Sequence, residues 1–265
     1  MAKVISFVNQ KGGVGKTTTA SNLATALAAT NNRVLLIDSD PQGNASTGYG
    51  ISSEQRKSNL YHALIGEKNV INCIVKTEVR NLDIVTSSVD LAAAEIELIG
   101  LEKPQFILKK SISNLHNLYD YILIDCPPSL GLLAVNALTA STSLMIPLQC
   151  EFFALEGLKH LLETFKLIKN TLNPNLVISG VVLTMYDKRN KLTEHVERDV
   201  RSCLGDLVYK TVIPRNVRVS EAPSYGKPVL IYDINCTGSS AYIDLAREFL
   251  TQEMMISSKI EEKVN

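Results

Sequence analysis

At 265 residues the chain is long enough to bury a substantial core, as one large α/β domain or two small ones. Its 27 basic and 27 acidic side chains balance, so nucleic-acid binding would need a local patch, or patches combined in an oligomer. The five cysteines are scattered and never spaced C-x-x-C, which argues against a disulfide framework or a zinc site and fits a reducing cytoplasm.

Short β-branched runs alternate with helical patterns along the chain. Their nearly continuous apolar character is typical of buried parallel strands, which we expect at 3–8, 33–38, 82–87, 121–125, 143–149 and 176–184. The clearest helices are expected at 151–170 and from about 239 to 251. This alternation predicts a single α/β domain over 1–265, doubly wound, with a mainly parallel sheet that carries helices on both faces.

Three segments depart from the regular alternation. The stretches 43–81 and 186–230 are long excursions between core elements, and such excursions often carry function. The polar tail, about 252–265, is expected to fray. No run approaches the ~20 apolar residues that a membrane-spanning helix needs, and no signal peptide is expected at the start of the chain.

A glycine-rich stretch, NQKGGVGKTT (9–18), follows the first expected strand directly. It differs from the phosphate-binding pattern G-x-x-x-x-G-K-[ST] because Gln10 replaces the first glycine, and it carries an additional lysine, Lys11. The glycines allow successive N–H groups to surround phosphate oxygens, and a helix beginning at Thr17 would add its positive end. Lys16 would reach the β- and γ-phosphates, and the Thr17 hydroxyl would contact Mg²⁺. A turn of purely structural use is the less favoured interpretation.

Carboxylates follow two other expected strands. Asp38 and Asp40 close the second strand, where Asp38 could support Mg²⁺ or its water shell and Asp40 could orient the attacking water. The run YILID delivers Asp125 to a strand end, as a Walker B magnesium ligand requires. A lone aspartate there would usually be a turn residue or helix cap. Three such positions behind a phosphate loop favour a magnesium–nucleotide site.

These motifs resemble those of the ParA/Soj partitioning ATPases, which belong to the deviant-Walker-A group of P-loop proteins. The resemblance rests on KGGVGKTT, DSDPQGN and IDCPPSLG, joined by IPLQCEFFALEGL and IPRNVRVSEAPSYGKP, and it runs from Lys3 to about Leu250. The first motif is shared with MinD-like and nitrogenase-reductase-like relatives. The PRNVRVSEAPS segment is more specific to the ParA branch.

The resemblance implies a role for each matching position. Lys11 would reach across a nucleotide-sandwich dimer to the phosphates of the other subunit, and Asp40 would be required for hydrolysis. Lys11, Lys16 and Asp40 would be catalytic, while Thr17, Asp40 and Asp125 would serve Mg²⁺. Thr18 would lie near the α-phosphate, and the region of Met185 and Tyr186 and the loop Pro214–Asn216 near the adenine. The implied ATP-binding residues are Lys11, Gly12, Gly13, Val14, Gly15, Lys16, Thr17, Thr18, Met185, Pro214 and Asn216.

Basic residues cluster in the late excursion. Taken alone, the segments YDKRNK and PRNVRVS are more readily interpreted as a solvated basic face. The resemblance implies instead a sequence-independent DNA surface in the ATP-bound dimer, with Arg189 and Arg218 as the nearest matches. Phosphate contacts of this kind carry little sequence information and are salt-sensitive. The implied DNA-binding residues are Lys188, Arg189, Arg215 and Arg218.

The resulting hypothesis is a slow, Mg²⁺-dependent ATPase for DNA segregation. Its ATP-dependent homodimer would hold double-stranded DNA non-specifically, and a ParB-like centromere-binding protein would stimulate hydrolysis and release it. The expected location is the cytoplasm, at the nucleoid, with no stable membrane association. The alternative is a MinD-like membrane-cycling ATPase, although the tail has little of the basic charge of an interfacial helix. A biosynthetic ATP-dependent ligase would need a pocket for which we identify no residues, and the positions of Cys126 and Cys150 disfavour an iron–sulfur reductase.

Overall fold

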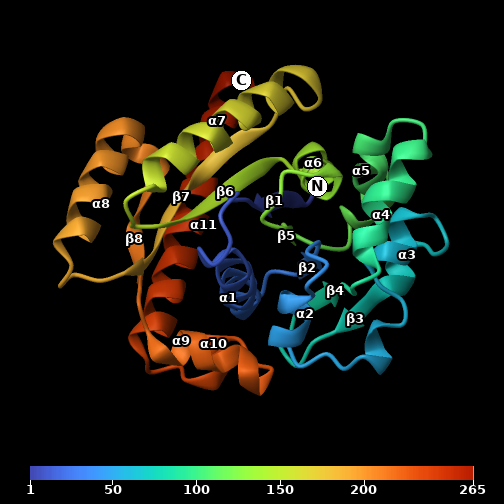
Figure 1. Cartoon of the computed structure of the whole chain (residues 1–265), viewed down its shortest axis with the longest axis horizontal. Helices are drawn as coiled ribbons and strands as arrows, with labels where there is room; N and C mark the ends of the chain where they lie inside the picture. The colour runs from blue at the N-terminus through green and yellow to red at the C-terminus, as the bar shows by residue number, and fades with distance from the viewer. Residues whose placement is uncertain (265) are drawn as a thin grey trace.

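The computed structural model describes the backbone of residues 1–264 and the side chains up to Met255. Its centre is an eight-stranded sheet with the order β3-β4-β2-β5-β1-β6-β7-β8 (Figure 1). All neighbouring strands are parallel except β3 and β4, which confirms the predicted mainly parallel sheet. The strands are β1 (Lys3–Phe7), β2 (Val34–Asp38), β3 (Ile74–Lys76), β4 (Leu82–Val85), β5 (Tyr121–Asp125), β6 (Ser143–Gln149), β7 (Val177–Tyr186) and β8 (Val208–Pro214).

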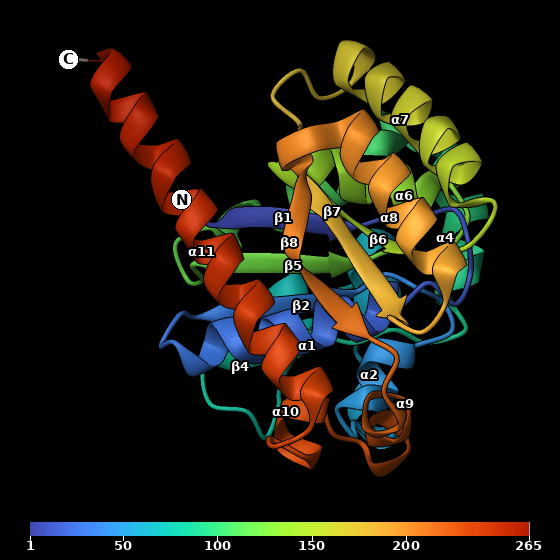
Figure 2. The ribbon, with the colours of Figure 1, turned by 90° about the vertical axis from the view of Figure 1, so that its left-hand side faces the viewer.

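Helices cover both faces of the sheet and bury a separate apolar cluster on each (Figures 1 and 2). Helices α1, α2, α10 and α11 lie on one face, where α11 packs along β8 and α1. Helices α3 to α8 lie on the other. Their bounds are α1 (Lys16–Ala29), α2 (Asn44–Gly48), α3 (Leu60–Leu64), α4 (Leu91–Glu97), α5 (Ile107–Ser111), α6 (Leu132–Ala140), α7 (Ala154–Thr171), α8 (Lys191–Leu204), α9 (Val217–Glu221), α10 (Val229–Tyr232) and α11 (Thr237–Val264).

The sequence interpretation missed both edge strands and misplaced one helix end. Strand β3 has only three residues, and β8 lies inside the excursion 186–230, where helices and turns surround it. The expected end of the last helix near Thr251 is wrong, because α11 continues to Val264. Residue 265 and the side chains of 256–264 lie outside the described part of the chain, so fraying of the tail stays a prediction.

The strand register brings three chain segments to one edge of the sheet. Phe7 of β1 and Asp38 of β2 are both paired with Asp125 of β5. Parallel strands end at the same edge, so the loops after β1, β2 and β5 leave the sheet side by side. The glycine-rich loop, Asp40 and Asp125 are therefore brought together by backbone pairing, before any side chain contributes.

Two glycines hold the segment after β2 against the C-terminal third of the chain. Gly50 follows α2 and Gly226 precedes α10, with φ angles of 67° and 64°. A Cβ atom on Gly226 would lie 2.7 Å from the Cα atom of Gly50, so the two backbones touch where only glycine fits. This contact sets the position of α2, which carries part of the site described below.

We expect Gly226→Ala to lower the free energy of unfolding by about 2–4 kcal/mol, because backbone strain and overpacking act together. The matched control is Gly66→Ala, where φ is 83° but a Cβ atom would meet nothing within 4 Å. The control should lose only about 1–2 kcal/mol, from backbone strain alone. Urea denaturation of both variants measures the difference, and equal losses would show that the Gly50–Gly226 contact is not tight.

Candidate functional site

The glycine-rich loop joins β1 to α1 in a conformation that suits an anion. Gly13 and Gly15 have φ angles of 75° and 86°, which favour glycine, and a Cβ atom on Gly12 or Gly13 would meet no other atom within 4 Å. Helix α1 begins at Lys16, one residue before the predicted start. No described side chain caps its first turn, and that turn contains no acidic residue. Its N–H groups therefore remain available to a phosphate.

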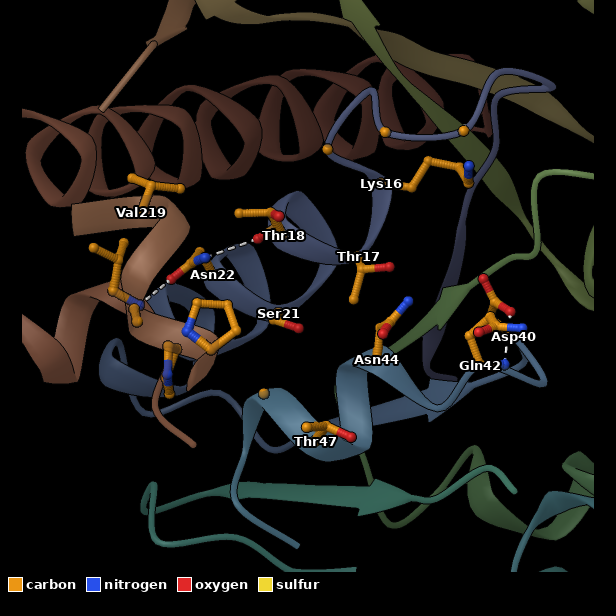
Figure 3. Close-up of a pocket in the computed structure, with 18 of the residues that line it drawn as sticks. Lys16, Thr17, Thr18, Ser21, Asn22, Asp40, Gln42, Asn44, Thr47 and Val219 are labelled. Atoms are coloured by element: carbon orange, nitrogen blue, oxygen red, sulfur yellow. Dashed lines mark hydrogen bonds between the residues drawn. The ribbon is translucent and has the colours of Figure 1, made fainter. Parts of the chain in front are cut away.

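A cavity of about 460 Å³ opens beneath this loop (Figure 3). Lys16, Asp40 and Asn44 lie at one end of it, and Val219 lies at the other. Its walls come from the loop, the first turns of α1, the segment from Asp40 to Gly48, and the segment from Val219 to Val229. The lining residues that the sequence interpretation did not single out include Ser21, Asn22, Gln42, Asn44, Thr47, Pro128 and Val219.

Lys16 is a buried cation at the base of the loop. Its side chain lines the cavity, and Nζ donates to the carbonyl oxygen of Lys11 at 3.2 Å. Burial lowers the pKa of Lys16, while the nearby carboxylates of Asp125 and Asp40 act in the opposite direction. A phosphate group in the cavity would supply the negative charge that stabilises the ammonium form.

Asp125 is fully buried at the end of β5, and neither of its oxygens accepts a well-formed hydrogen bond from any described residue. Burial raises its pKa well above the ordinary value, and the charge of Asp38 raises it further, while the Thr17 hydroxyl acts in the opposite direction. Buried carboxylates without partners are rare in folded proteins. A divalent cation that prefers oxygen ligands, such as Mg²⁺, fits this position chemically.

The surrounding groups determine what such a cation would use as ligands. Asp38 is already engaged, because its Oδ2 accepts bonds from the backbone N–H and the hydroxyl of Ser46 at 2.8 and 2.6 Å. Burial raises the pKa of Asp38 to about 6. Within the described residues, no group of three or more His, Cys, Asp or Glu side chains could hold a metal by itself. Mg²⁺ would therefore depend on phosphate oxygens and water, with the Thr17 hydroxyl and Asp125 nearby.

Asp40 lies in the turn after β2, with its side chain at the cavity. Its Oδ1 accepts the backbone N–H of Gln42 at 2.9 Å, and its own N–H points to Asp38 Oδ1 at 3.4 Å. Asp40, Gln42 and Asn44 therefore lie on one turn at the end of the cavity that Lys16 occupies (Figure 3). The DSDPQGN motif contained the signal for Gln42 and Asn44, but only the three-dimensional turn shows that both face the cavity.

Lys11 lies at the rim of the cavity and is not among the residues that line it. Its Nζ forms an ion pair with Glu151, at the turn after β6, and about half of its side chain is exposed. Asn9 supports the loop beside it, since Asn9 Oδ1 accepts the Lys11 N–H at 3.0 Å. In this single chain the additional lysine is thus turned away from its own phosphate loop.

The residues expected near the adenine are only partly brought together. Met185 lines the cavity with an unusual φ of 51°, but Pro214 and Asn216 are not among the lining residues. Asn216 caps α9, where its Oδ1 accepts the Arg218 N–H at 2.8 Å, and its Nδ2 donates to Thr237. Pro214 lines a second cavity of about 650 Å³ between the ends of β7 and β8 and helix α11. The first cavity is lined instead by three residues that follow the loop Pro214–Asn216 in the chain, namely Val219, Ala222 and Pro223.

The predicted DNA-binding residues are exposed, three on the segments after β7 and β8 and Arg218 on α9, and acidic neighbours engage two of them. Asp187 holds Arg189 through two bonds of 2.9 and 2.8 Å. Arg218 is paired with Glu221 at 3.1 Å and with Asp233 at 3.5 Å. Lys188 and Arg215 are exposed and line the second cavity together with Arg189. The basic segments therefore form a mixed-charge surface and not an uninterrupted basic patch.

Comparison with known proteins places these features in context. A family model described as an AAA domain matches residues 2–178. The chain is 56% identical over 253 residues to the chromosome partitioning protein ParA of Caulobacter vibrioides, covering 95% of each chain. It is 52% identical over 248 residues to the sporulation initiation inhibitor protein Soj of Bacillus subtilis, covering 94% of this chain and 98% of Soj.

Solved structures show the same architecture. Cobyrinic acid a,c-diamide synthase from Mycobacterium smegmatis, with bound ADP and magnesium, superposes with a TM-score of 0.81 at 32% identity over 93% of both chains. A putative plasmid partition protein from Borrelia burgdorferi B31, bound to AMPPNP, gives 0.81 at 28% identity, covering 95% of this chain and 100% of that one. The cell division ATPase MinD of Pyrococcus furiosus gives 0.79 at 28% identity with the same coverage.

The raised pKa of Asp125 leads to a prediction for the protein without Mg²⁺ and nucleotide. Because the pKa of Asp125 is raised in the folded state, ionising this carboxyl lowers the free energy of unfolding. The loss is absent below the unfolded pKa of about 4 and grows as pH rises from there to the folded pKa. We expect Asp125→Asn to be more stable than the wild type by about 1–3 kcal/mol near pH 8, with the difference narrowing toward pH 5.

Urea denaturation at both pH values tests this expectation, with Asp199→Asn on the exposed surface of α8 as the matched control. The control should stay within about 0.5 kcal/mol of the wild type at both pH values. If Asp125→Asn were less stable than the wild type throughout, the carboxylate would have a favourable partner in the free protein.

Proposed function

Because the chain belongs to the ParA/Soj family of P-loop ATPases, we propose that it is a DNA-segregation ATPase whose ATP-bound dimer holds DNA without sequence preference. The observation that carries the nucleotide half of this proposal is the buried carboxylate of Asp125, without a well-formed hydrogen bond, near Lys16 and the uncapped first turn of α1. This combination has little use without a magnesium-bound anion. Related structures that contain ADP with magnesium, or AMPPNP, support ATP and Mg²⁺ as the ligands.

Each site residue would have a separate role in hydrolysis. The N–H groups of the loop and the first turn of α1 would hold the phosphates, and Lys16 would neutralise charge on the β- and γ-phosphates. Mg²⁺, when bound, would polarise the phosphate oxygens, held near Thr17 and Asp125. Asp40, on the turn that also carries Gln42, would orient the attacking water from the same end of the cavity. Hydrolysis would be slow until a partner stimulates it.

Lys11 would complete the site of a second subunit. Its ion pair with Glu151 holds it outside the lining of its own cavity, and Lys16 is the lysine that faces that cavity. Two chains that face each other across their nucleotides would exclude water from the phosphates and strengthen the attraction to an added cation. ATP would thereby favour the dimer, and loss of the γ-phosphate would release it.

The DNA surface would be weak in one chain and effective in two. Arg189 and Arg218 are each partly neutralised by their own carboxylates, so the monomer presents modest positive charge. Dimerisation would place two such surfaces on one particle, and bivalent attachment raises the apparent affinity without new contacts. A relative named for chromosome partitioning supports a role in DNA segregation. In that role a ParB-like partner would stimulate hydrolysis and return the protein from the nucleoid.

Membrane cycling of the MinD kind is the less supported function. The relatives named as chromosome-partitioning proteins are 46–56% identical to this chain, whereas the MinD structure is 28% identical. Through the described part of the chain, no helix is both long and apolar enough to cross a bilayer, but a MinD-like protein would need only an interfacial helix. Sedimentation with liposomes tests the alternative directly, and ATP-dependent recovery in the lipid pellet would favour it over DNA segregation.

We expect Arg218→Glu to reduce ATP-dependent retention on DNA at least tenfold, because it replaces a phosphate-contacting cation with a repelling anion. Retention on immobilised double-stranded DNA measures the effect at a fixed salt concentration. The control is Arg80→Glu, an exposed arginine in the turn before β4, at the opposite edge of the sheet. Equal retention of the wild type and Arg218→Glu, or no retention of either, would contradict the DNA half of the proposal.

We expect Lys11→Ala to abolish ATP-dependent dimerisation while the single chain still binds nucleotide, because Lys11 does not line its own cavity. Light scattering with a non-hydrolysable ATP analogue measures the mass, and a fluorescent ATP analogue measures binding. Lys16→Ala is the informative control, since loss of the lining lysine should weaken nucleotide binding itself. A full-strength Lys11→Ala dimer would remove the role assigned to this lysine.

A further inference from the structure

The segment after β2 forms one wall of the nucleotide cavity. Four of its residues line the cavity along one side (Figure 3), namely Asp40, Gln42, Asn44 and Thr47. Its helix, α2, has five residues and lies between two glycines of positive φ, Gly43 and Gly50. A helix this short is unstable by itself in water, so tertiary contacts must hold it in place. The position of the lining residues therefore depends on what the segment contacts.

The inward side of α2 is held by groups of the core. The N–H and hydroxyl of Ser46 donate to Asp38, and the Tyr49 hydroxyl donates to the carbonyl oxygen of Ser21 at 2.7 Å. These contacts do not include the carbonyl groups at the two ends of the segment, those of Gly43 and Ile51. Both of these carbonyl groups face a single side chain from the next turn of the chain, that of Arg56.

Arg56 belongs to the short 3₁₀ helix η1 (Glu54–Arg56), and its guanidinium group folds back onto α2. Nε and Nη2 both donate to the carbonyl oxygen of Ile51, at 3.1 and 2.8 Å. Nη2 also donates to the Thr47 hydroxyl at 3.0 Å, and Nη1 makes a longer bond of 3.5 Å to the carbonyl oxygen of Gly43. A Cβ atom on Gly43 would lie 3.0 Å from Nη1, so the guanidinium group packs directly against this glycine. One side chain therefore contacts both ends of α2.

The hydrogen bonds of Arg56 continue to the backbone of Asp40. The Thr47 hydroxyl, which accepts from Arg56, donates to the carbonyl oxygen of Gly43 at 2.9 Å. The Gly43 N–H in turn donates to the carbonyl oxygen of Asp40, also at 2.9 Å. A charged donor at the start of such a chain polarises and strengthens the bonds that follow. The guanidinium group is thus linked to the turn that carries Asp40.

Arg56 has no acidic partner that would explain its position otherwise. Among the residues that the structure describes, no carboxylate forms an ion pair with Arg56. Its side-chain hydrogen bonds go to oxygen atoms of the segment 43–51. The planar guanidinium group can make this set of bonds at once, whereas the single nitrogen of a lysine cannot. The contact therefore depends on the shape of the side chain as well as on its charge.

We propose that Arg56 is a positioning residue for ATP hydrolysis, which fixes the turn that carries Asp40. The proposal rests on the ATPase of the proposed function, in which Asp40 orients the attacking water. Arg56 does not line the cavity, so it acts on the placement of Asp40 and not on the nucleotide itself. A displacement of about 1 Å in an orienting group can slow a reaction about 100-fold. Loss of the guanidinium group should therefore slow hydrolysis of ATP that is still bound.

The variants Arg56→Ala and Arg56→Lys test this role, since the second keeps the charge and loses the shape. With protein in excess over ATP and with Mg²⁺ present, both should hydrolyse bound ATP at least tenfold more slowly than the wild type. Their dissociation constants for a fluorescent ATP analogue should stay within threefold of the wild-type value. Light scattering with a non-hydrolysable analogue should show the wild-type dimer. The matched control is Lys57→Ala, which removes the exposed cation next in the chain and should leave the rate unchanged.

Free guanidinium ion separates positioning from a general loss of structure. At millimolar concentrations, far below those that unfold proteins, it should raise the hydrolysis rate of Arg56→Ala at least threefold, because it can occupy the space that the side chain leaves. Methylammonium ion, with the same charge and a different shape, should have no such effect. Neither ion should restore Asp40→Ala, which lacks the orienting carboxylate itself. Equal effects of the two ions on Arg56→Ala, or no effect of guanidinium, would contradict the positioning role.

Hydrogen exchange shows where the variant differs from the wild type. In Arg56→Ala the amides of residues 41–51 should exchange faster than in the wild type, while those of β1 and β5 should keep their wild-type rates. Faster exchange throughout the chain would overturn the proposal, because the lost rate would then follow from lower global stability.

The remaining outcomes separate this proposal from the one on which it rests. Hydrolysis at the wild-type rate by Arg56→Ala would overturn the positioning role and leave the ATPase intact. Nucleotide binding or dimerisation weakened as much as the rate would also overturn it, because Arg56 would then act on assembly of the site. A wild type that does not hydrolyse ATP, or that Asp40→Ala does not slow, would overturn the proposed hydrolysis together with the role of Arg56.

Discussion

A buried carboxyl group without a well-formed hydrogen bond, that of Asp125, is the constraint on which the rest of this site depends. The pairing of β5 with β1 and β2 places it at the carboxyl edge of the sheet, beside Asp38 and Lys16. Burial disfavours its ionised form, and the nearby Asp38 carboxylate adds to the cost. Protonation removes this cost, and a bound cation offsets it while keeping the carboxylate ionised; the glycine-rich loop above it supplies the anion site that would bring such a cation in with its ligand.

The same edge of the sheet serves two tasks. The loops after β1, β2 and β5 shape the nucleotide cavity, and the next loop along the sheet, after β6, carries Glu151. Lys11 joins the two, since it lies in the loop after β1 and forms an ion pair with Glu151 in the loop after β6. Nucleotide binding and self-association would therefore be coupled because their surfaces are neighbours, and no conformational change in the core would be required.

Much of the fold and the phosphate end of the site could be predicted from the sequence, because both depend on local patterns. Apolar runs located the six inner strands, and GKT with two strand-end aspartates located Lys16, Asp40 and Asp125. Strands β3 and β8 escaped notice, since a three-residue strand and a strand among short helices give little periodic signal.

The remaining features depend on tertiary contacts. The Lys11–Glu151 pair joins positions 140 residues apart, so its geometry cannot be inferred from either motif. The wall formed by Val219 and Pro223, in place of the expected Pro214 and Asn216, follows from how α9 and the residues after it pack against α10, which contacts α1. Phe152 and Phe153 have the composition of core residues, and only the structure shows them exposed.

The central claim is that ATP, by pairing two chains, creates the form that holds DNA. The most direct test is the dependence of DNA binding on protein concentration, measured with a non-hydrolysable ATP analogue and with ADP at the same salt concentration. The account predicts a second-order rise with the analogue and little binding with ADP. A first-order rise, or equal binding with both nucleotides, would contradict it.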